Sequence, residues 1–227
     1  MVKPIYLTQA DHDLVTAAVA DAEAATSGEI MTIVARRSDS YHDVGLSWAA
    51  AATFVMLALI AAFPDHLRAL LSALLRDWDH ELADWKLLTG TLGLLLLVFL
   101  VVRYMLAIMP LRMLVTPAAT RARRARRRAI LLFRTAAEAR TRARTGVLLY
   151  LSLDEHRAEI VADRAISGKV APEIWGDAMA ALIDAVRAGQ PGAGLAEAVR
   201  RIGLILAAHF PRDADDSNEL PDRLIEL

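Results

Sequence analysis

The chain of 227 residues contains no cysteine. Its fold therefore depends on no disulfide, and thiolate metal sites and cysteine nucleophiles are excluded as well. The absence of cysteine does not by itself assign the protein to a compartment, so localisation has to be inferred from the distribution of charge and hydrophobicity.

The common catalytic motifs are also missing. The sequence has no P-loop, no G-x-S-x-G elbow and no H-E-x-x-H zinc motif. His156 is a candidate acid or base, but a single histidine in an exposed turn is also an ordinary turn residue. Catalysis therefore has weak local support in the sequence.

Two long hydrophobic runs interrupt what otherwise reads as one soluble α/β domain. Leu46 to Phe63 is uncharged over 18 residues, and Leu87 to Met109 has Arg103 as its single charge in 23 residues. About 20 apolar residues cross the hydrocarbon core of a bilayer as a helix. We expect an inserted two-helix transmembrane hairpin, and the alternative is a pair of buried core helices.

This interpretation sets the domain boundaries. Residues 1–45 form the first part of the soluble domain, residues 46–109 form the hairpin with spans 46–63 and 87–109, and residues 110–227 form the second part. The loop 64–86 is expected outside. It carries leucines with helical spacing that suit a short amphipathic helix on the membrane, although a plain loop is the alternative. Trp48, Trp78 and Trp85 suit interfacial anchors.

Positive charge is concentrated after the second span. Residues 87–144 carry 12 basic and one acidic residue, whereas the first 45 residues carry three basic and seven acidic ones. That acidic start predicts no signal peptide. By the positive-inside rule, the protein is expected in the bacterial inner membrane with both termini and the soluble domain in the cytoplasm.

The arginine cluster has three interpretations. It is a topology determinant, and it is also expected to bind anionic lipid headgroups of the bilayer. Nucleic-acid binding is not expected, because the segment has one aromatic residue, Phe133, and no recognisable reading module. The residues assigned to headgroup binding are Arg121, Arg123, Arg124, Arg126, Arg127 and Arg128.

Periodicity predicts the elements of the soluble domain. Helices are expected over 9–26, 117–143, 172–188 and 193–209, and a strand over 29–35. The apolar runs 146–153 and 158–162 flank a polar turn and should pair as an antiparallel hairpin. Trp175 has inward-facing helical neighbours and is expected in the core.

Several segments in order resemble the TPM domain, the fold of thylakoid-lumen acid-phosphatase-like proteins and of many bacterial membrane proteins. They are LTQADHDLVTAAVADAEAATSGEI, RTGVLLYLSLDEHRAEIVADRAISGKV, Trp175 and HFPRDADDSNELPD. The resemblance covers nearly all of the chain outside the hairpin. It implies an α/β/α sandwich around a small mixed sheet, which the element order supports independently.

The resemblance leaves activity open. Some members are described as acid phosphatases or divalent-cation binders, and others resemble assembly or repair factors beside membrane complexes. Phosphatase-like members carry a glycine-rich segment after the second hairpin strand, whereas this chain reads ADRAIS with no glycine before Gly168. This departure weighs against an inherited phosphatase activity.

Acidic residues at strand ends suggest one candidate metal site. Glu29 starts the first strand, Asp163 ends the second hairpin strand, and Glu219 lies in an acidic tail, so the three could share Ca²⁺ or Mg²⁺. The alternative is a solvated acidic tail with helix caps. We therefore expect a membrane-anchored binding or assembly and repair module with an unidentified membrane-protein partner, and a metal-dependent phosphatase-like enzyme as the alternative.

Overall fold

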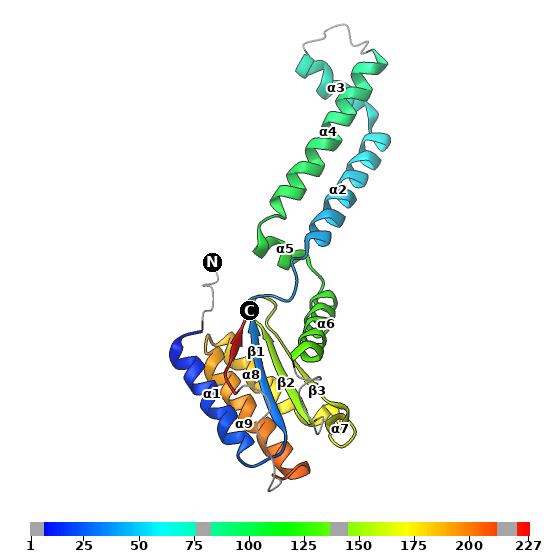
Figure 1. Cartoon of the computed structure of the whole chain (residues 1–227). Helices are drawn as coiled ribbons and strands as arrows, with labels where there is room; N and C mark the ends of the chain where they lie inside the picture. Colours follow the sequence, from blue (N-terminus) through cyan, green and yellow to red (C-terminus); the bar gives the residue numbers. More distant parts are fainter. Residues whose placement is uncertain (1–6, 76–82, 137–144, 213–221) are drawn as a thin grey trace. The chain divides into compact units, whose positions relative to one another are not determined.

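The computed structural model describes residues 7–75, 83–136, 145–212 and 222–227. The chain divides into two compact units, each described here by itself (Figure 1). One unit combines residues 1–39 with residues 118–227 and contains the sheet. The other unit consists of residues 40–117 and contains the hydrophobic helices.

The first unit is built on a mixed four-stranded sheet in the order β3-β2-β1-β4. Its strands are β1 (Glu29–Ala35), β2 (Gly146–Ser152), β3 (Arg157–Ala162) and β4 (Ile225–Glu226). β2 and β4 run parallel to β1, and β3 runs antiparallel to β2. The predicted antiparallel hairpin and mixed sheet are confirmed. All residues of β1 and β2 are buried, as expected for central strands covered on both faces.

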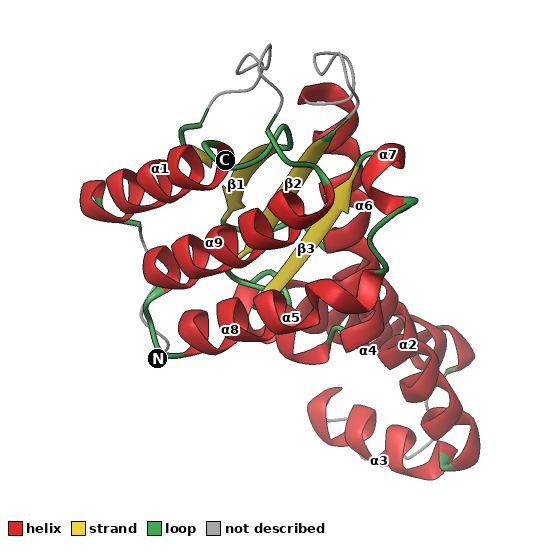
Figure 2. Ribbon diagram, turned by 90° about the horizontal axis from the view of Figure 1, so that it is seen from below, coloured by secondary structure: helices red, strands yellow, loops and turns green. Residues whose placement is uncertain are grey.

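Helices α1 (Gln9–Glu23), α8 (Gly176–Arg187) and α9 (Pro191–His209) cover one face of the sheet (Figure 2). Val15, Leu182 and Ile202 pack there with the side chains of one sheet face. Trp175 belongs to the same cluster and is 7% exposed, so its predicted place in the core is confirmed.

Helix α6 (Ala118–Ala136) covers the opposite face. Ala125, Ala129 and Phe133 are spaced four residues apart, and they pack against side chains that include Met31 and Tyr150. Because small alanines occupy the contact stripe, the helix can lie close to the sheet. The unit is therefore an α/β/α sandwich, as expected.

The structure corrects several element boundaries. The capping box of Thr8 and Asp11 starts α1 as predicted, but the helix ends at Glu23, and Thr26 instead bridges to Pro211. The helix expected from Pro172 begins with a 3₁₀ turn, η1 (Pro172–Trp175), before α8 starts. A short helix, α7 (Arg164–Ser167), and strand β4 were not predicted.

The second unit contains α2 (His42–Ala62), α3 (Pro64–Leu75), α4 (Asp84–Met105) and α5 (Met109–Val115). Helices α2 and α4 have mean hydropathies of 2.1 and 2.2, and only 11% and 0% of their most apolar windows are buried. They are long and apolar enough to span a membrane. Such exposure of apolar side chains is not what a pair of buried core helices would show.

The segment between the two apolar helices contains the expected amphipathic helix, α3. Leu67 and Leu71 are buried, whereas Leu70 and Leu74 are exposed. Leu71 packs against Gly90 of α4, where an added Cβ would lie 2.6 Å from a leucine methyl group. Of the expected interfacial tryptophans, Trp48 and Trp85 are exposed, and Trp78 lies outside the described residues.

A buried arginine closes the base of this unit. Arg112 of α5 is 4% exposed and donates hydrogen bonds to the carbonyl oxygens of Leu106 at 2.7 Å, Ser40 at 2.6 Å and Ala107 at 3.2 Å. Leu106 and Ala107 directly follow α4, and carbonyls at a helix end have no partner within the helix. Arg112 thus joins the end of α4 to the segment that leads into α2.

Candidate functional site

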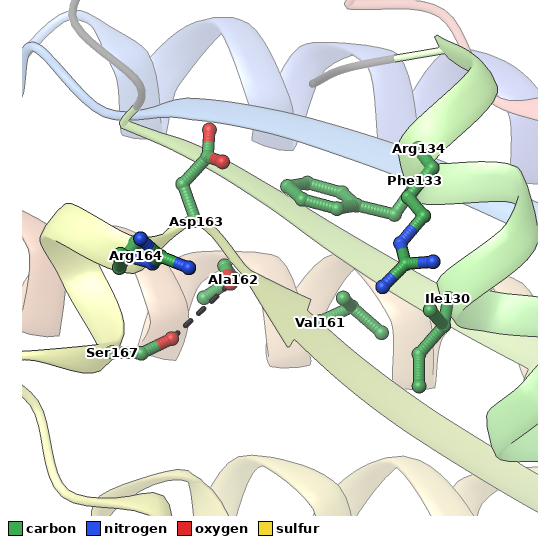
Figure 3. Close-up of a pocket in the computed structure, with 8 residues that line it drawn as sticks. All are labelled: Ile130, Phe133, Arg134, Val161, Ala162, Asp163, Arg164 and Ser167. Atoms are coloured by element: carbon green, nitrogen blue, oxygen red, sulfur yellow. Dashed lines mark hydrogen bonds between the residues drawn. The ribbon is translucent and has the colours of Figure 1, made fainter.

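A pocket of about 430 Å³ lies beside the end of β3. Figure 3 shows Arg134 from α6 and Arg164 from α7 on two sides of the pocket, with Asp163 and Ser167 near Arg164. Both arginines are exposed at its mouth. Two guanidinium groups at one cavity form a site that suits a phosphate or carboxylate group, because each offers a planar fork of N–H donors.

Asp163 itself has a structural role at this pocket. Its carboxylate accepts a hydrogen bond from the Gly146 N–H at 3.1 Å, and its own N–H donates to the Gly146 carbonyl at 2.9 Å. The side chain is 6% exposed. Asp163 therefore fixes the start of β2 against the end of β3, and one carboxylate oxygen is engaged in doing so.

The metal-site residues predicted from the sequence are partly placed by the structure. Glu29 pairs in register with Gly146, so Glu29 and Asp163 lie at the same end of the sheet with β2 between them. Two strand spacings put their backbones about 10 Å apart. Glu219 lies outside the described residues. Among the residues described, no three His, Asp or Glu side chains gather as a metal site, and the three-residue site stays a prediction.

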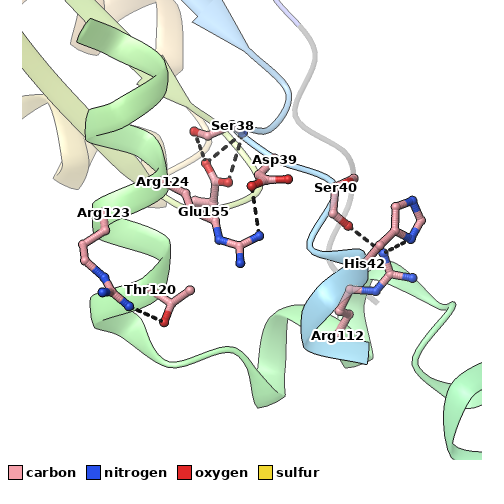
Figure 4. A network of polar contacts seen from close by, with 9 residues as sticks. All are labelled: Ser38, Asp39, Ser40, His42, Arg112, Thr120, Arg123, Arg124 and Glu155. Carbon is pink, nitrogen blue, oxygen red and sulfur yellow. Dashed lines mark hydrogen bonds and ion pairs between the residues drawn. The ribbon is translucent and has the colours of Figure 1, made fainter. Parts of the chain in front are cut away.

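A second polar cluster occupies the opposite end of β2. Glu155, in the turn after β2, is 2% exposed. Its carboxylate accepts hydrogen bonds from the Ser38 N–H at 3.0 and 3.1 Å, from the Ser38 hydroxyl at 2.6 Å and from the Ser152 hydroxyl. Figure 4 shows Glu155 directed toward Ser38. These bonds connect the loop after β1 to the β2–β3 turn.

The same cluster extends to a tyrosine and an ion pair. Tyr150 shares a hydrogen bond of 3.0 Å with the Ser38 hydroxyl, and burial raises the pKa of the Tyr150 phenol above its ordinary value. Arg124 of α6 donates to Asp39 at 2.9 Å. The carboxyl ends of parallel strands are where ligands commonly bind in α/β proteins. Here those ends are filled by hydrogen bonds within the domain.

Sequence reasoning named Glu155 and His156 as turn residues and missed the partners of Glu155. His156 is exposed with φ of 47°, which fits a turn position. Ser38 and Tyr150 carried no motif. The available signal was a serine shortly after β1 and another at the end of β2, together with an acidic residue in the β2–β3 turn.

A half-buried carboxylate on β3 forms an ion pair with an arginine of α6. Glu159 receives a hydrogen bond from Arg126 of α6 at 3.2 Å. Burial raises the pKa of Glu159 above its ordinary value, and the hydrogen bond and charge of Arg126 oppose that rise. Arg126 therefore stabilises the ionised carboxylate.

Residues 110–204 match the family model described as the TPM domain. Most of the sheet-containing unit is therefore similar to this family model, and we call that unit the TPM domain after the similarity. The matched segment runs from α5 into α9, and β1 joins the same sheet through its parallel pairing with β2. The arginine-bearing helix α6 and the Asp163 pocket both lie inside the matched segment of the TPM domain.

The fold is also similar to a solved structure. The NMR structure of BA42 protein from the psychrophilic bacterium Bizionia argentinensis matches with a TM-score of 0.56 and 18% sequence identity, covering 98% of this chain and 96% of that one. At this identity the likeness shows a similar fold and nothing about function. No match was found among curated proteins.

Proposed function

We propose that this protein is a membrane-anchored TPM domain that acts as a binding module for assembly or repair beside complexes of the bacterial inner membrane. In this proposal α2 and α4 span the bilayer, and the TPM domain and both termini lie in the cytoplasm. The partner is another membrane protein, held within reach because the anchor is inserted between β1 and α6.

The use of the buried carboxylates supports binding rather than catalysis. Glu155 accepts from the Ser38 N–H and Asp163 accepts from the Gly146 N–H, and both side chains are buried. Each of these carboxylates holds together parts of the chain distant in sequence. Groups tied in this way are positioned by the fold rather than presented to a substrate.

Site-specific photo-crosslinking in growing cells tests the binding module. A photoreactive amino acid placed at exposed apolar positions of the TPM domain should give a discrete adduct with one membrane protein. Suitable positions are Leu14, Ile174 and Leu204, with exposed fractions of 39%, 44% and 72%. The exposed Asp184 on α8 serves as the matched control. Equal, diffuse adducts at all four positions would contradict a specific partner.

The pocket beside Asp163 favours a second candidate function, a divalent-metal-dependent acid-phosphatase-like enzyme. Arg134 and Arg164 would bind the phosphate group, and Asp163 and Glu29 would supply part of an oxygen shell for Ca²⁺ or Mg²⁺ with Glu219. Carboxylates fit these hard cations chemically. However, Asp163 already accepts a hydrogen bond from the Gly146 N–H, so binding of a cation would compete with this structural role.

Aryl phosphate hydrolysis by the full-length protein in detergent separates the two functions. If the protein is an enzyme, the rate of aryl phosphate hydrolysis should rise with Ca²⁺ or Mg²⁺ and should fall at least tenfold in Arg164→Gln. Arg187→Gln, which removes an exposed arginine of α8, should leave it unchanged. Background rates in all variants, with or without metal, would support the binding module.

A further inference from the structure

The arginines of α6 divide into groups with different surroundings. The stripe of Ala125, Ala129 and Phe133 faces the sheet. At 100° per residue, the direction opposite this stripe is occupied by Arg123, Arg127 and Leu131. We call these three residues the outer stripe.

The arginines flanking the outer stripe are engaged within the domain. Arg124 pairs with Asp39 at 2.9 Å, and Arg126 pairs with Glu159 at 3.2 Å. Glu159 is half-buried, so its pairing with Arg126 offsets part of the burial of a charge. Removing either arginine would break an ion pair within the domain.

The outer stripe is differently placed. Arg123 and Arg127 are both exposed, and neither makes an ion pair with any residue that the structure describes. Arg123 donates a hydrogen bond of 3.5 Å to the hydroxyl of Thr120, within the same helix. Leu131 continues the stripe with an exposed fraction of 52%. Two solvated cations in line with an exposed leucine form an amphipathic surface.

We propose that the outer stripe binds anionic phospholipid headgroups of the leaflet through which α4 leaves the membrane. The inference rests on the proposed membrane anchoring and assigns a ligand to one surface of the TPM domain. Arg123 and Arg127 bind lipid phosphates, and Leu131 contacts the boundary of the acyl chains. Arg124 and Arg126 are paired within the domain, so we assign headgroup binding to Arg123 and Arg127 and not to these two.

Charge complementarity and chain continuity favour lipid over other polyanions. Arg123 follows the end of α4 at Met105 by fewer than twenty residues, so the length of the connecting chain allows the stripe to reach the bilayer surface. An exposed leucine suits the acyl boundary and has no role in a phosphate-only contact. Nucleic acid would call for stacking side chains, and the stripe contains none.

The absence of cysteine allows a direct test on the full-length protein. Leu131→Cys, labelled with an environment-sensitive fluorophore, is reconstituted in nanodiscs containing lipids with a quencher near the headgroup. Quenching should be strong in discs with phosphatidylglycerol and weak in discs of phosphatidylcholine alone. Raising the salt concentration to 0.5 M should remove the difference, because it screens exposed charges.

Matched variants in the same background decide which residues act. Arg123→Gln with Arg127→Gln should weaken the lipid-dependent association about 30-fold, since two basic residues near an anionic surface are removed. Arg187→Gln with Arg200→Gln removes the same charge from exposed positions on α8 and α9 and should change it less than twofold. Arg123→Lys with Arg127→Lys should retain most of it, because charge rather than fork geometry carries the attraction.

Equal quenching in both lipids, or equal loss in the two double glutamine variants, would overturn the proposal. So would a label that responds to added DNA but not to phosphatidylglycerol. These outcomes differ from a failure of the proposed anchoring, in which the protein would not incorporate into nanodiscs in any lipid.

Discussion

Glu155 joins two segments of the TPM domain that lie 117 residues apart in the chain. The carboxylate takes four hydrogen bonds from the backbone and side chain of Ser38 and the hydroxyl of Ser152. Such a residue fixes two loops at once, because its single carboxylate accepts hydrogen bonds from both of them. Its contribution to stability should therefore exceed that of any single hydroxyl around it.

Glu155→Ala should lower the stability of the folded protein by about 3 to 5 kcal/mol, because buried donors lose a charged partner. Ser152→Ala should cost about 1 kcal/mol, since one hydrogen bond is lost and Glu155 keeps the others. The melting temperatures of the full-length proteins in detergent measure both effects. A smaller loss for Glu155→Ala than for Ser152→Ala would contradict the assigned role.

Glu159 gives a prediction that depends on pH. Burial raises its pKa in the folded state, so the folded protein binds this proton more tightly than the unfolded chain does. The stability that the folded protein gains from this proton is fully present below the pKa of Glu159 in the unfolded chain. It is lost as the pH rises through the pKa of Glu159 in the folded protein. Arg126 opposes this effect. Arg126→Gln should therefore raise the pKa of Glu159 further.

The melting temperature of Arg126→Gln should accordingly fall more between pH 4 and pH 7 than that of the wild type. Adding Glu159→Gln to this variant removes the titrating group and should abolish the extra slope. If the double variant keeps the steeper pH dependence of the melting temperature, a group other than Glu159 causes it.

Among the elements, α5 shows how a short helix can organise longer ones. Its buried Arg112 hydrogen-bonds to carbonyl oxygens at the end of α4 and before α2. Arg112→Gln should lower the yield of folded protein in detergent several-fold, since one amide cannot supply these bonds. Size-exclusion profiles measure the folded fraction. Arg103→Gln, which changes an arginine of α4, is the control and should stay close to the wild type.

The sequence predicted the elements whose patterns extend over several residues. β1, β2 and β3 are apolar runs, and Thr8 with Asp11 marks a helix start by local chemistry alone. The two residues of β4 are too few for a pattern, and their strand depends on pairing with Ile33 and Val34. α5 was missed because its seven residues are too few for a helical pattern, and its first residue, Met109, was assigned to the preceding span.

The candidate sites were less predictable than the elements for a related reason. Asp163 stands at the end of a recognisable strand, so its position was accessible from the pattern. The contacts of Arg126 with Glu159 and of Ser38 with Glu155 join elements that only the folded sheet brings together. Nothing in their local sequence distinguishes these residues from solvated ones.

At the scale of the whole molecule, the excess of arginine after α4 leads to a prediction about topology. A reporter fused after Leu227 should be active only in the cytoplasm, and one inserted near Asp77 only outside it. Reversed activities would place the TPM domain in the periplasm. The reporter enzymes are read in intact cells, so the result does not depend on purification.

The parallel pairing of β1 with β2 also governs how the protein is made. Both hydrophobic helices are encoded between these neighbouring strands, so β1 leaves the ribosome roughly 5 to 25 s before β2 is complete. During that interval β1 has no partner strand, although every residue of β1 is buried in the folded protein. In the proposed topology, insertion of α2 and α4 would precede closure of the sheet, and a delayed insertion would leave an aggregation-prone strand exposed on the nascent chain.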